Sequence, residues 1–566
     1  MYVEITLEKL SPGAKEGKIG KLHKQMGDEI NIGDTIAEIE GKKGNIPVKS
    51  KVQGTLESLE VDEGSIVKIG DVLAKVAIVE EETSLDSKST TPSPSKEDLT
   101  TKEIIEGDIA ILGGGPGGYV AALQGAKMGA KIILIEKDKV GGTCLNRGCI
   151  PTKALVRSAE VYDDIKNAEQ YGLLVEKATV DMKKVIERKD TIVENLVQGI
   201  EYLLKKQKVI LKSGNGKLLD QNTIQVDDTT LVKAKNIIIA TGSKICKPPF
   251  PGMDLKNVMT SEDALELKEL PPKILIVGGG IIGMEFAFIY ANMGVDVSVI
   301  EYMDDILCML DQDVIREISR IAKSKGITLY TKSKVLEIIE GEGQNCIVKF
   351  EQKGKEKYIS SDKVLVCVGR IPEYENIGME NLQLEINPNN KGIQVNSHMQ
   401  TNVSNIYAIG DVTNIMQLAH VASHQGIIAI QHILGQDRQM DYSAVPSAIF
   451  TSPEIALVGI SEKEAKANNM DIVVGKFPFA ANGKALTYGE TRGFVKIIKE
   501  KETGKIIGCT IIGPHASDLI AEVTLAIKNE LTVEKIIETI HAHPTTAESI
   551  HEAALASEGG ALHFAN

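Results

Sequence analysis

The stretch DIAILGGGPGGYVAALQGAKMGAKIILIEKD (Asp108 to Asp138) decides the fold of most of this 566-residue chain. An apolar run leads into a Gly-x-Gly-x-x-Gly turn, a helical pattern follows, and a second apolar run ends on Glu136. This order predicts a strand, a turn, a helix and a second strand, packed as a βαβ unit. Gly113 permits the tight turn, Gly115 lets the backbone approach a pyrophosphate, and Gly118 lets helix and strand pack closely. The stretch therefore predicts a dinucleotide site, with Glu136 placed to bond a ribose hydroxyl.

A second unit of the same kind follows in KILIVGGGIIGMEFAFIYANMGVDVSVIEY (Lys273 to Tyr302). Gly278, Gly280 and Gly283 repeat the glycine turn, and Glu301 ends the second strand. A single run of this kind is often only a tight strand-to-helix turn, but two complete units make that reading improbable. The residues after Glu301, YMDDIL, hold no Arg or Lys to receive a 2′-phosphate, which favours NAD over NADP.

The bulk composition limits the class of protein. The length allows roughly three to five domains, and few aromatics with no Trp favour α/β layers. A net charge of −14 argues against a nucleic-acid partner, and the apolar run at Ile274 to Met284 is too short to span a membrane. We expect no signal peptide in MYVEITLEKL, and seven scattered cysteines fit a reducing cytoplasm.

Two segments precede the first dinucleotide unit. Residues 81–100, EETSLDSKSTTPSPSKEDLT, are rich in Ser, Thr, Pro and charge, and place a flexible linker at 80–104. Before it, MGDEINIGDTIAEIE (Met26 to Glu40) returns as EGSIVKIGDVLAKVA (Glu63 to Ala77). Glycine turns and period-2 alternation predict short strands. Residues 1–79 are therefore expected to form a small β domain whose halves are related by a pseudo-twofold axis.

The sequence between the two copies, IEGKKGNIPV (Ile39 to Val48), places Lys42 and Lys43 on the hairpin that joins the halves. An exposed lysine at a hairpin tip is usually only a solubilising residue. The domain, however, resembles the lipoyl/biotinyl carrier family, whose swinging-arm lysine stands at this tip. The resemblance implies a covalent lipoate on Lys43. The alternative is an unmodified domain that serves only for docking.

A close cysteine pair, Cys144 and Cys149, lies in GGTCLNRGCIPTK (Gly141 to Lys153). Two dinucleotide sites beside two cysteines suggest that nicotinamide exchanges a hydride with flavin, and flavin exchanges electrons with a disulfide. In a regular helix, residues five apart have Cα atoms roughly 8–9 Å apart, whereas a disulfide needs about 4.4–6.8 Å. We therefore predict a distorted helix here, eased by Gly148 and Pro151. A metal site is improbable, because no second Cys/His cluster is near in sequence.

From about residue 105 onward the chain resembles the flavin-dependent pyridine nucleotide–disulfide oxidoreductases. GGTCLNRGCIPTK is a specific signature of that family, and further motifs match at Ala240–Gly242, Val368–Arg370, Ile406–Asp411 and Leu418–Ala422. The expected fold is α/β, with two Rossmann-like dinucleotide-binding domains plus an α+β dimerisation domain, preceded by the small all-β lipoyl-like domain. The expected domains are an FAD-binding domain at 105–250, an NAD-binding domain at 251–370, a central domain at 371–444 that completes the FAD site, and an interface domain at 445–566.

The resemblance also implies cofactor contacts. For FAD these are Gly113, Gly115, Gly118, Glu136, Gly142, Thr143, Lys153, Gly214, Gly216, Thr241, Gly242, Asp411 on the ribityl chain, and Ala419 against the flavin. For NAD they are Gly278, Gly280, Gly283, Glu301, Val335 and Gly369. Lys153 is expected near the reactive edge of the flavin, paired with Glu285.

Near the C-terminus, HAHPTTAESIHEA (His541 to Ala553) matches the family's acid–base segment. The His directly before Pro-Thr is His543, and its partner acid is Glu548. The chemistry needs such a base, because a thiolate attacks a disulfide and a free thiol has a pKa near 8.5. By analogy, substrate deprotonated by His543 attacks Cys144, and Cys149 becomes a thiolate beside the flavin. The family puts the base and the cysteines on different subunits, which implies a homodimer.

Within the family, the chain most resembles the branch that oxidises dihydrolipoamide with NAD⁺. The attached lipoyl-like domain supports this reading and implies partners, the lipoyl domains and acyltransferase core of a multienzyme complex. Glutathione, mercuric and thioredoxin reductases share the core. The last two would need further C-terminal cysteines, which the ending LHFAN lacks, and glutathione reductase normally uses NADP. A glutathione-like reductase with a docking tether stays the alternative, and a scaffold without activity leaves the cysteine pair without a purpose.

Overall fold

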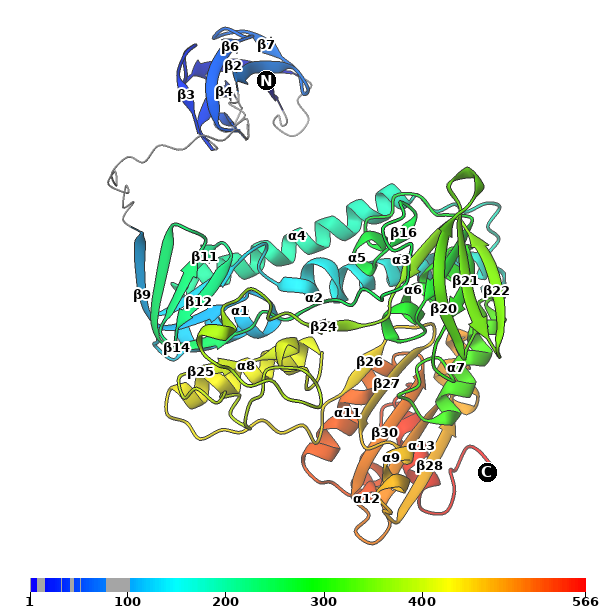
Figure 1. The fold of residues 1–566 in the computed structure, drawn as a ribbon. Coiled ribbons are helices and arrows are strands. Elements are labelled where there is room, and N and C mark those ends of the chain that lie inside the picture. The colour runs from blue at the N-terminus through cyan, green and yellow to red at the C-terminus, as the bar shows by residue number, and fades with distance from the viewer. Residues whose placement is uncertain are drawn as a thin grey trace. The chain divides into compact units, whose positions relative to one another are not determined.

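The computed structural model describes residues 2–7, 16–31, 33–40, 45–50, 52–77 and 102–565, and Figure 1 shows their fold. The chain divides into two compact units, Met1–Leu99 and Thr100–Asn566. Lys42, Lys43 and the linker residues 81–100 lie outside the described residues, so the predictions made for them are not addressed by this structure.

The first unit is built of two four-stranded sheets, in the orders β1-β8-β6-β3 and β5-β4-β2-β7. Ile19, Ile36 and Leu73 are completely buried in the core of this unit. The predicted repeat is visible in the topology. β3 of the first copy and β7 of the second each end a sheet, and β4 of the first copy and β8 of the second each lie second from the other end, in opposite sheets. The strands are β1 (Tyr2–Thr6), β2 (Gly17–Leu22), β3 (Glu29–Ile30), β4 (Thr35–Glu40), β5 (Ile46–Lys49), β6 (Gly54–Leu59), β7 (Ile66–Val67) and β8 (Val72–Ala77).

The second unit begins with a sheet in the order β11-β10-β9-β14-β13-β12, with β25 beside β14. β9 starts at Glu103, and Glu103 and Ile104 already pair with β14. The pairs that β9 makes with β10 and β14 are parallel, as a βαβ unit requires. The elements are β9 (Glu103–Leu112), α1 (Pro116–Lys127), β10 (Ile132–Glu136), α2 (Gly142–Arg147), α3 (Cys149–Lys166), α4 (Met182–Lys206), β11 (Ile210–Ser213), β12 (Gly216–Asp220), β13 (Thr223–Val226), β14 (Thr230–Ile239), β25 (Ile406–Ala408) and α8 (Ala419–Ile433).

A second sheet, whose strands are all parallel, has the order β16-β23-β17-β18-β19 and is followed by the antiparallel sheet β20-β21-β22 (Figure 1). The central strands of the parallel sheet, β17 and β18, are mostly apolar, because a parallel sheet is buried on both faces. A short pair, β15 with β24, joins the two dinucleotide regions. The elements are β15 (Ser243–Ile245), β16 (Val258–Met259), α5 (Ser261–Ala264), β17 (Lys273–Val277), α6 (Ile281–Asn292), β18 (Asp296–Ile300), α7 (Gln312–Ser324), β19 (Thr328–Tyr330), β20 (Ser333–Glu340), β21 (Cys346–Gln352), β22 (Lys355–Ser361), β23 (Lys363–Val366) and β24 (Arg370–Pro372).

The C-terminal part is an antiparallel sheet, β26-β27-β30-β29-β28, packed against helices α11 and α13. Together with the mixed sheet around β9 and the parallel sheet around β17, this arrangement confirms the expected fold class. The elements are β26 (Ser447–Ile449), β27 (Glu454–Gly459), α9 (Glu462–Ala467), β28 (Ile472–Pro478), α10 (Gly483–Tyr488), β29 (Phe494–Glu500), β30 (Ile506–Gly513), α11 (Ala516–Lys528), α12 (Val533–Glu538) and α13 (Glu548–Ala556).

A buried ion cluster ties this C-terminal sheet to the second parallel sheet region. Lys496 on β29 is completely buried, and its Nζ lies 2.7 Å from Asp311 and 2.8 Å from Asp313, at the start of α7. Asp311 also accepts the backbone N–H groups of Glu462 and Lys463, which begin α9. The cluster therefore joins α7, α9 and β29. Separating these elements would leave a buried charge without its partner, which is strongly destabilising.

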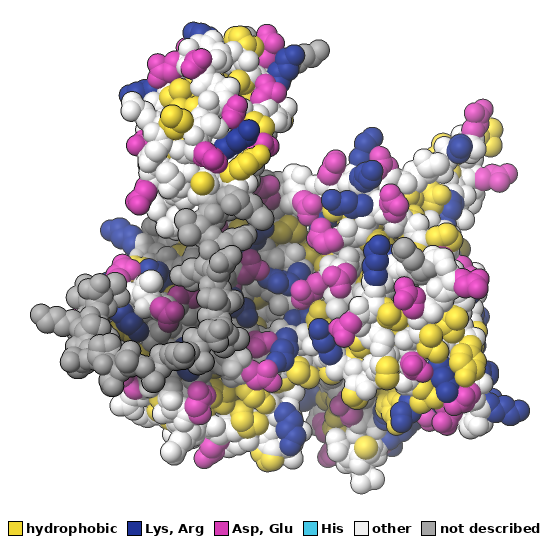
Figure 2. All heavy atoms as spheres, turned by 45° about the horizontal axis from the view of Figure 1, so that its top comes forward, with side chains coloured by type: hydrophobic (Ala, Val, Ile, Leu, Met, Phe, Trp, Pro, Cys, Tyr) yellow, Lys and Arg dark blue, Asp and Glu magenta, His cyan; other side chains and the backbone are white. Residues whose placement is uncertain are grey.

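The visible surface carries both signs of charge. Figure 2 shows Lys and Arg side chains interspersed with Asp and Glu over the face turned to the viewer. Among the described residues, no helix combines the length and the apolar character that crossing a membrane would require.

Candidate active site

The two glycine turns adopt conformations that few other residues could adopt. Gly113 has φ +109° and Gly278 has φ +108°, both in the region that favours glycine. A Cβ on Gly118 would lie 1.8 Å from the carbonyl oxygen of Gly113, and one on Gly283 would lie 1.9 Å from that of Gly278. The third glycine of each turn is therefore what lets α1 and α6 press against the preceding turn.

The N-termini of α1 and α6 are open to a ligand. Neither N-cap residue, Gly115 or Gly280, supplies a side-chain cap, so the first N–H groups of each helix remain available for an anion. The acids that end the neighbouring strands brace the turns: Glu136 accepts the N–H of Gly114 at 2.6 Å, and Glu301 accepts the N–H of Gly279 at 2.5 Å. The same geometry thus recurs at both predicted dinucleotide sites.

One continuous cavity of about 2330 Å³ connects both turns. It is larger than the roughly 300–1,000 Å³ of a single small-ligand pocket, so two dinucleotides fit it better than one. The predicted cofactor residues that line it are Gly113, Gly115, Glu136, Gly142, Thr143, Lys153, Gly214, Gly216, Thr241, Gly242, Asp411 and Ala419 on the FAD side, and Gly278, Gly280, Glu301, Val335 and Gly369 on the NAD side. Gly118 and Gly283 stand behind this lining, where they make the helix contacts described above.

The cysteine pair lies at a break between two helices. α2 ends at Arg147, Gly148 has the non-helical angles φ −143° and ψ −109°, and α3 starts at Cys149. The predicted distortion is confirmed, and Gly148 provides it. Both thiols are free and are hydrogen-bonded to each other.

The two thiols differ in acidity. The hydrogen bond from Cys144 lowers the pKa of Cys149 to about 7, with help from the positive charge of Lys153 and against the cost of burial. The same hydrogen bond, followed by burial, raises the pKa of Cys144. Of the pair, Cys149 is therefore the one that is ionised near neutral pH.

Lys153 and Glu285 form an ion pair across the cavity, from helices that are far apart in sequence. The Lys153 Nζ lies 3.0 Å from both carboxylate oxygens of Glu285, which is only 5% exposed. Glu285 also accepts the N–H of Phe450 at 2.9 Å, and the Lys153 ammonium lies 4.3 Å from the centre of the Phe450 ring. The sequence analysis missed Phe450, because no local pattern marks a residue that acts through its backbone and ring face.

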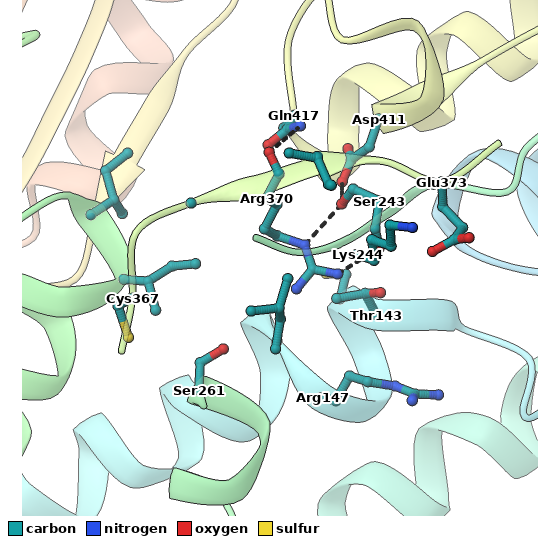
Figure 3. Close-up of a pocket in the computed structure, with 18 of the residues that line it drawn as sticks. Thr143, Arg147, Ser243, Lys244, Ser261, Cys367, Arg370, Glu373, Asp411 and Gln417 are labelled. Atoms are coloured by element: carbon teal, nitrogen blue, oxygen red, sulfur yellow. Dashed lines mark hydrogen bonds between the residues drawn. The ribbon is translucent and has the colours of Figure 1, made fainter. Parts of the chain in front are cut away.

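A second polar group surrounds Asp411 (Figure 3). The Ser243 hydroxyl donates to Asp411 at 2.6 Å and accepts from the Arg370 Nε at 2.8 Å. Burial raises the pKa of Asp411, against the hydrogen bond of Ser243 and the charge of Arg370. Ser243 and Arg370 were not predicted as individual site residues, although Ser243 directly follows the Ala240–Gly242 motif and Arg370 ends the Val368–Arg370 motif.

The proposed base forms a second site on the same chain. His543 Nδ1 lies 2.9 Å from Glu548 Oε1, and the other oxygen of Glu548 accepts the N–H of Thr545 at 2.8 Å. The His543 side chain is 80% exposed and does not line the cavity that holds the cysteines. The neighbouring histidines are engaged elsewhere, since His541 is buried against Glu522 and His551 faces the carbonyl of Ile537.

Comparison with known proteins identifies the family. The model for pyridine nucleotide-disulphide oxidoreductases matches residues 107–426, and the model for their dimerisation domain matches 445–554. The chain therefore belongs to the pyridine nucleotide-disulphide oxidoreductases. Residues 3–76 match a third model, described as biotin-requiring enzyme, which covers biotinyl and lipoyl domains.

Individual relatives show which members of the family the chain resembles. The chain is 45% identical over 473 residues to a dihydrolipoyl dehydrogenase of Bacillus subtilis, covering 81% of this chain and 99% of that one. It is 39% identical over 466 residues to the mitochondrial dihydrolipoyl dehydrogenase of Pisum sativum, covering 81% and 93%. Among solved structures it resembles the HOCl-induced flavoprotein disulfide reductase RclA from Escherichia coli, with TM-score 0.71, 27% identity, and 79% and 99% coverage.

The residues present fit the cofactors that the family implies, which are FAD and a pyridine nucleotide. Two uncapped helix N-termini provide for two pyrophosphates, and bare glycine backbone lets each approach closely. The cysteine pair and Lys153 line the same cavity as both turns. The chain is an oxidoreductase, and its dimerisation domain indicates a homodimer.

Proposed function

We propose that this enzyme oxidises protein-bound dihydrolipoamide to lipoamide and reduces NAD⁺. The observation that carries the proposal is the hydrogen-bonded thiol pair, whose ionisable member Cys149 lies beside Lys153 in a cavity that reaches both dinucleotide turns. The identity with dihydrolipoyl dehydrogenases over almost their whole length supports the choice of substrate. The N-terminal lipoyl-type domain supports it independently.

The chemistry on this chain's residues starts from a Cys144–Cys149 disulfide. His543, oriented by Glu548, takes a proton from one substrate thiol, and the resulting thiolate attacks Cys144. The sulfur–sulfur bond breaks and Cys149 leaves as a thiolate, stabilised by the Lys153 charge. The second substrate thiol then loses its proton and displaces Cys144, which releases lipoamide. The enzyme is left with the reduced pair that the structure contains.

The cofactors complete the reaction. FAD, when bound, supplies the exchange of two electrons between the thiol pair and the hydride of the nicotinamide. On this proposal the FAD residues are those named on the FAD side of the cavity, with Asp411 on the ribityl chain. On this proposal Glu301 favours NAD over NADP, since its carboxylate, held by the N–H groups of Gly279 and Met303, would repel a 2′-phosphate, and the segment YMDDIL after it holds no Arg or Lys.

The base must come from a second copy of the chain. His543 stands exposed, outside the cavity of its own cysteines, so the site is complete only when a partner brings its base to the thiol pair. We propose the domain boundaries 105–250, 251–370, 371–444 and 445–566 for FAD binding, NAD binding, completion of the FAD site and this subunit contact.

The N-terminal unit is proposed to carry lipoate on Lys43 and to connect the enzyme with the lipoyl domains and acyltransferase core of a multienzyme complex. The repeat that frames Lys43 and the match to a biotinyl and lipoyl domain model support this. Intact-mass measurement of protein from its native host should show the added mass of one lipoyl group, and Lys43→Ala should lose it. An unmodified parent protein would leave only the docking role.

Matched variants of the purified holoenzyme test the main proposal. Cys149→Ser should abolish NADH formation from dihydrolipoamide and NAD⁺, while Cys509→Ser, which alters a buried thiol of the C-terminal sheet, should keep it. His543→Gln should lose most of the activity and still bind FAD. If Cys149→Ser still formed NADH from dihydrolipoamide, the proposal that electrons pass through the Cys144–Cys149 pair would be refuted. Faster reduction of glutathione disulfide than of lipoamide by the parent enzyme would favour the alternative reductase.

A further inference from the structure

A hairpin of the C-terminal part reaches the cavity that holds the thiol pair. β26 is the edge strand of the C-terminal sheet and pairs antiparallel with β27, so residues 450–453 connect the two strands (Figure 1). Of the described residues after 445, Ser447, Ala448 and Phe450 line the cavity. This hairpin is therefore where the C-terminal part of the chain meets the thiol site of the same chain.

The hairpin is held in place on both sides of Phe450. Ile449 is buried in a core cluster to which α3 and α6 also contribute. Thr451 is buried as well, and its hydroxyl donates to a carbonyl group of the same turn at 2.7 Å. The backbone of Phe450 therefore has a fixed place relative to α3 and α6, the helices that carry Lys153 and Glu285.

Phe450 contacts both members of the ion pair that these helices form. Its N–H donates to Glu285 Oε1 at 2.9 Å, the same oxygen that lies 3.0 Å from the Lys153 Nζ. Its ring centre lies 4.3 Å from that Nζ, well inside the roughly 6 Å over which an aromatic ring attracts an ammonium. The Lys153 ammonium is thus held by the carboxylate and by the ring, and the carboxylate is held by the backbone of Phe450.

The position of these charges matters for the thiol pair. The hydrogen bond from Cys144 lowers the pKa of Cys149, and burial raises it. Of the nearby charges, Lys153 lowers this pKa and Glu285 raises it. Arg370, on β24, is a further charged group that interacts with Cys149. Since Lys153 and Glu285 oppose each other, their net effect depends on how near each is held to Cys149, and a lysine on its flexible four-carbon stem needs contacts to fix it.

We propose that Phe450 is a positioning residue for the reaction proposed above, on which this inference rests. Its ring keeps the Lys153 ammonium beside Cys149, and its N–H keeps the opposing Glu285 carboxylate in place. The thiolate that leaves when the disulfide opens is therefore stabilised by a charge that the C-terminal part of the same chain holds. That part then serves both subunits, its own through Phe450 and the partner subunit through His543.

The test compares Phe450→Leu with Phe450→Tyr in the full-length holoenzyme. Leucine removes the face of the ring but keeps the N–H and an apolar side chain, whereas tyrosine keeps the ring. The reduced holoenzyme is alkylated with iodoacetamide over a range of pH, and mass spectrometry follows Cys149 separately from Cys144, because trypsin cleaves between them after Arg147. The pH midpoint for Cys149 should rise by about 0.4 to 0.7 unit in Phe450→Leu, the size expected when one cation–π contact is lost. The midpoint of Phe450→Tyr should stay with the parent, and kcat for dihydrolipoamide should fall about two- to fivefold in Phe450→Leu alone.

Phe494→Leu is the matched control. The Lys476 Nζ lies 3.4 Å from the centre of the Phe494 ring on β29, and neither residue lines the cavity. The same substitution in the same part of the chain should therefore leave the Cys149 midpoint unchanged. A shift as large as that of Phe450→Leu would show that only the stability of this part matters, and would overturn the inference.

A double-mutant cycle isolates the contact between the ring and the ammonium. Lys153→Met alone should raise the Cys149 midpoint, and adding Phe450→Leu to it should raise the midpoint no further. An unmoved midpoint in Phe450→Leu would overturn the inference, and so would an equal shift with and without Lys153. If Phe450→Leu does not fold, Phe450→Met, which is also apolar and has no ring, takes its place. The alkylation needs no dihydrolipoamide, so the proposed function fails separately, if the parent enzyme does not oxidise that substrate.

Discussion

Gly118→Ala should loosen the proposed FAD site without removing any polar side chain. The added methyl carbon would start 1.8 Å from the carbonyl oxygen of Gly113, and contacts shorter than 3.0 Å are essentially never observed. Gly113 cannot move away easily, since its φ is +109° and its N–H is bound to Ile135 at 2.8 Å. The N-terminus of α1 must therefore retreat by more than about 1 Å.

The energetic size of this change can be bounded. Overpacking of this kind costs about 2 to 3 kcal/mol. If this whole cost is borne by the FAD-bound form of the protein, it weakens FAD binding by the same free energy. The Kd for FAD should then rise by roughly 30- to 150-fold. Equilibrium dialysis against FAD, together with the ratio of flavin to protein absorbance after purification, measures this loss.

Gly199→Ala is the matched control. Gly199 is exposed within α4, and a Cβ there would meet no atom within 4 Å. The same substitution should therefore stabilise the protein against urea by about 0.5 to 1 kcal/mol and leave FAD binding unchanged. If Gly118→Ala binds FAD as tightly as the parent protein, the close approach of α1 is not what shapes the site.

Two further predictions concern charges. Glu285→Gln should lower the pH at which Cys149 reacts with iodoacetamide, because the hydrogen bond of Cys144 already lowers the pKa of Cys149 and the negative charge of Glu285 works against it; an unchanged or higher midpoint would contradict this. Asp441→Asn should destabilise the protein at pH 7 by at most about 1 kcal/mol, since both partners are half exposed. The hydrogen bond from Lys528 lowers the pKa of Asp441 to about 2, so the stabilisation is complete above the unfolded pKa of about 3.9 and is lost as the pH falls through about 2. Urea unfolding of both proteins should show their difference shrinking over that range, and a constant difference would refute the assignment.

The features that the sequence predicted are those that short-range rules control. Gly113 and Gly278 are needed for positive φ within a strand–turn–helix pattern, so both dinucleotide turns were evident from spacing alone. The helix break at Gly148 followed from comparing two distances, the Cα separation in a helix and that in a disulfide. His543 and Glu548 depended on family resemblance, because a lone histidine pattern does not indicate a base.

Contacts between distant segments were not predictable in this way. The Ser243–Asp411 hydrogen bond joins residues on two separate elements, and the Phe450 ring reaches Lys153 from the C-terminal part of the chain. Nothing in the sequence around Lys496 distinguishes it from a surface lysine on an alternating strand. Its burial arises only because α7 and α9 both converge on β29. Such pairings depend on tertiary packing, which periodicity does not encode.

The buried Lys496 cluster has a consequence for how the molecule melts. If only α7 or only β29 unfolded, the other would keep the charge of Lys496, or those of Asp311 and Asp313, buried without a partner. Such an unpaired buried charge is strongly destabilising. The nucleotide-binding part around α7 and the sheet that supports α13 should consequently lose structure in one cooperative step. Scanning calorimetry should therefore resolve a single endotherm for residues 102–565, whereas the small N-terminal unit, with a core of its own, should melt as a separate event.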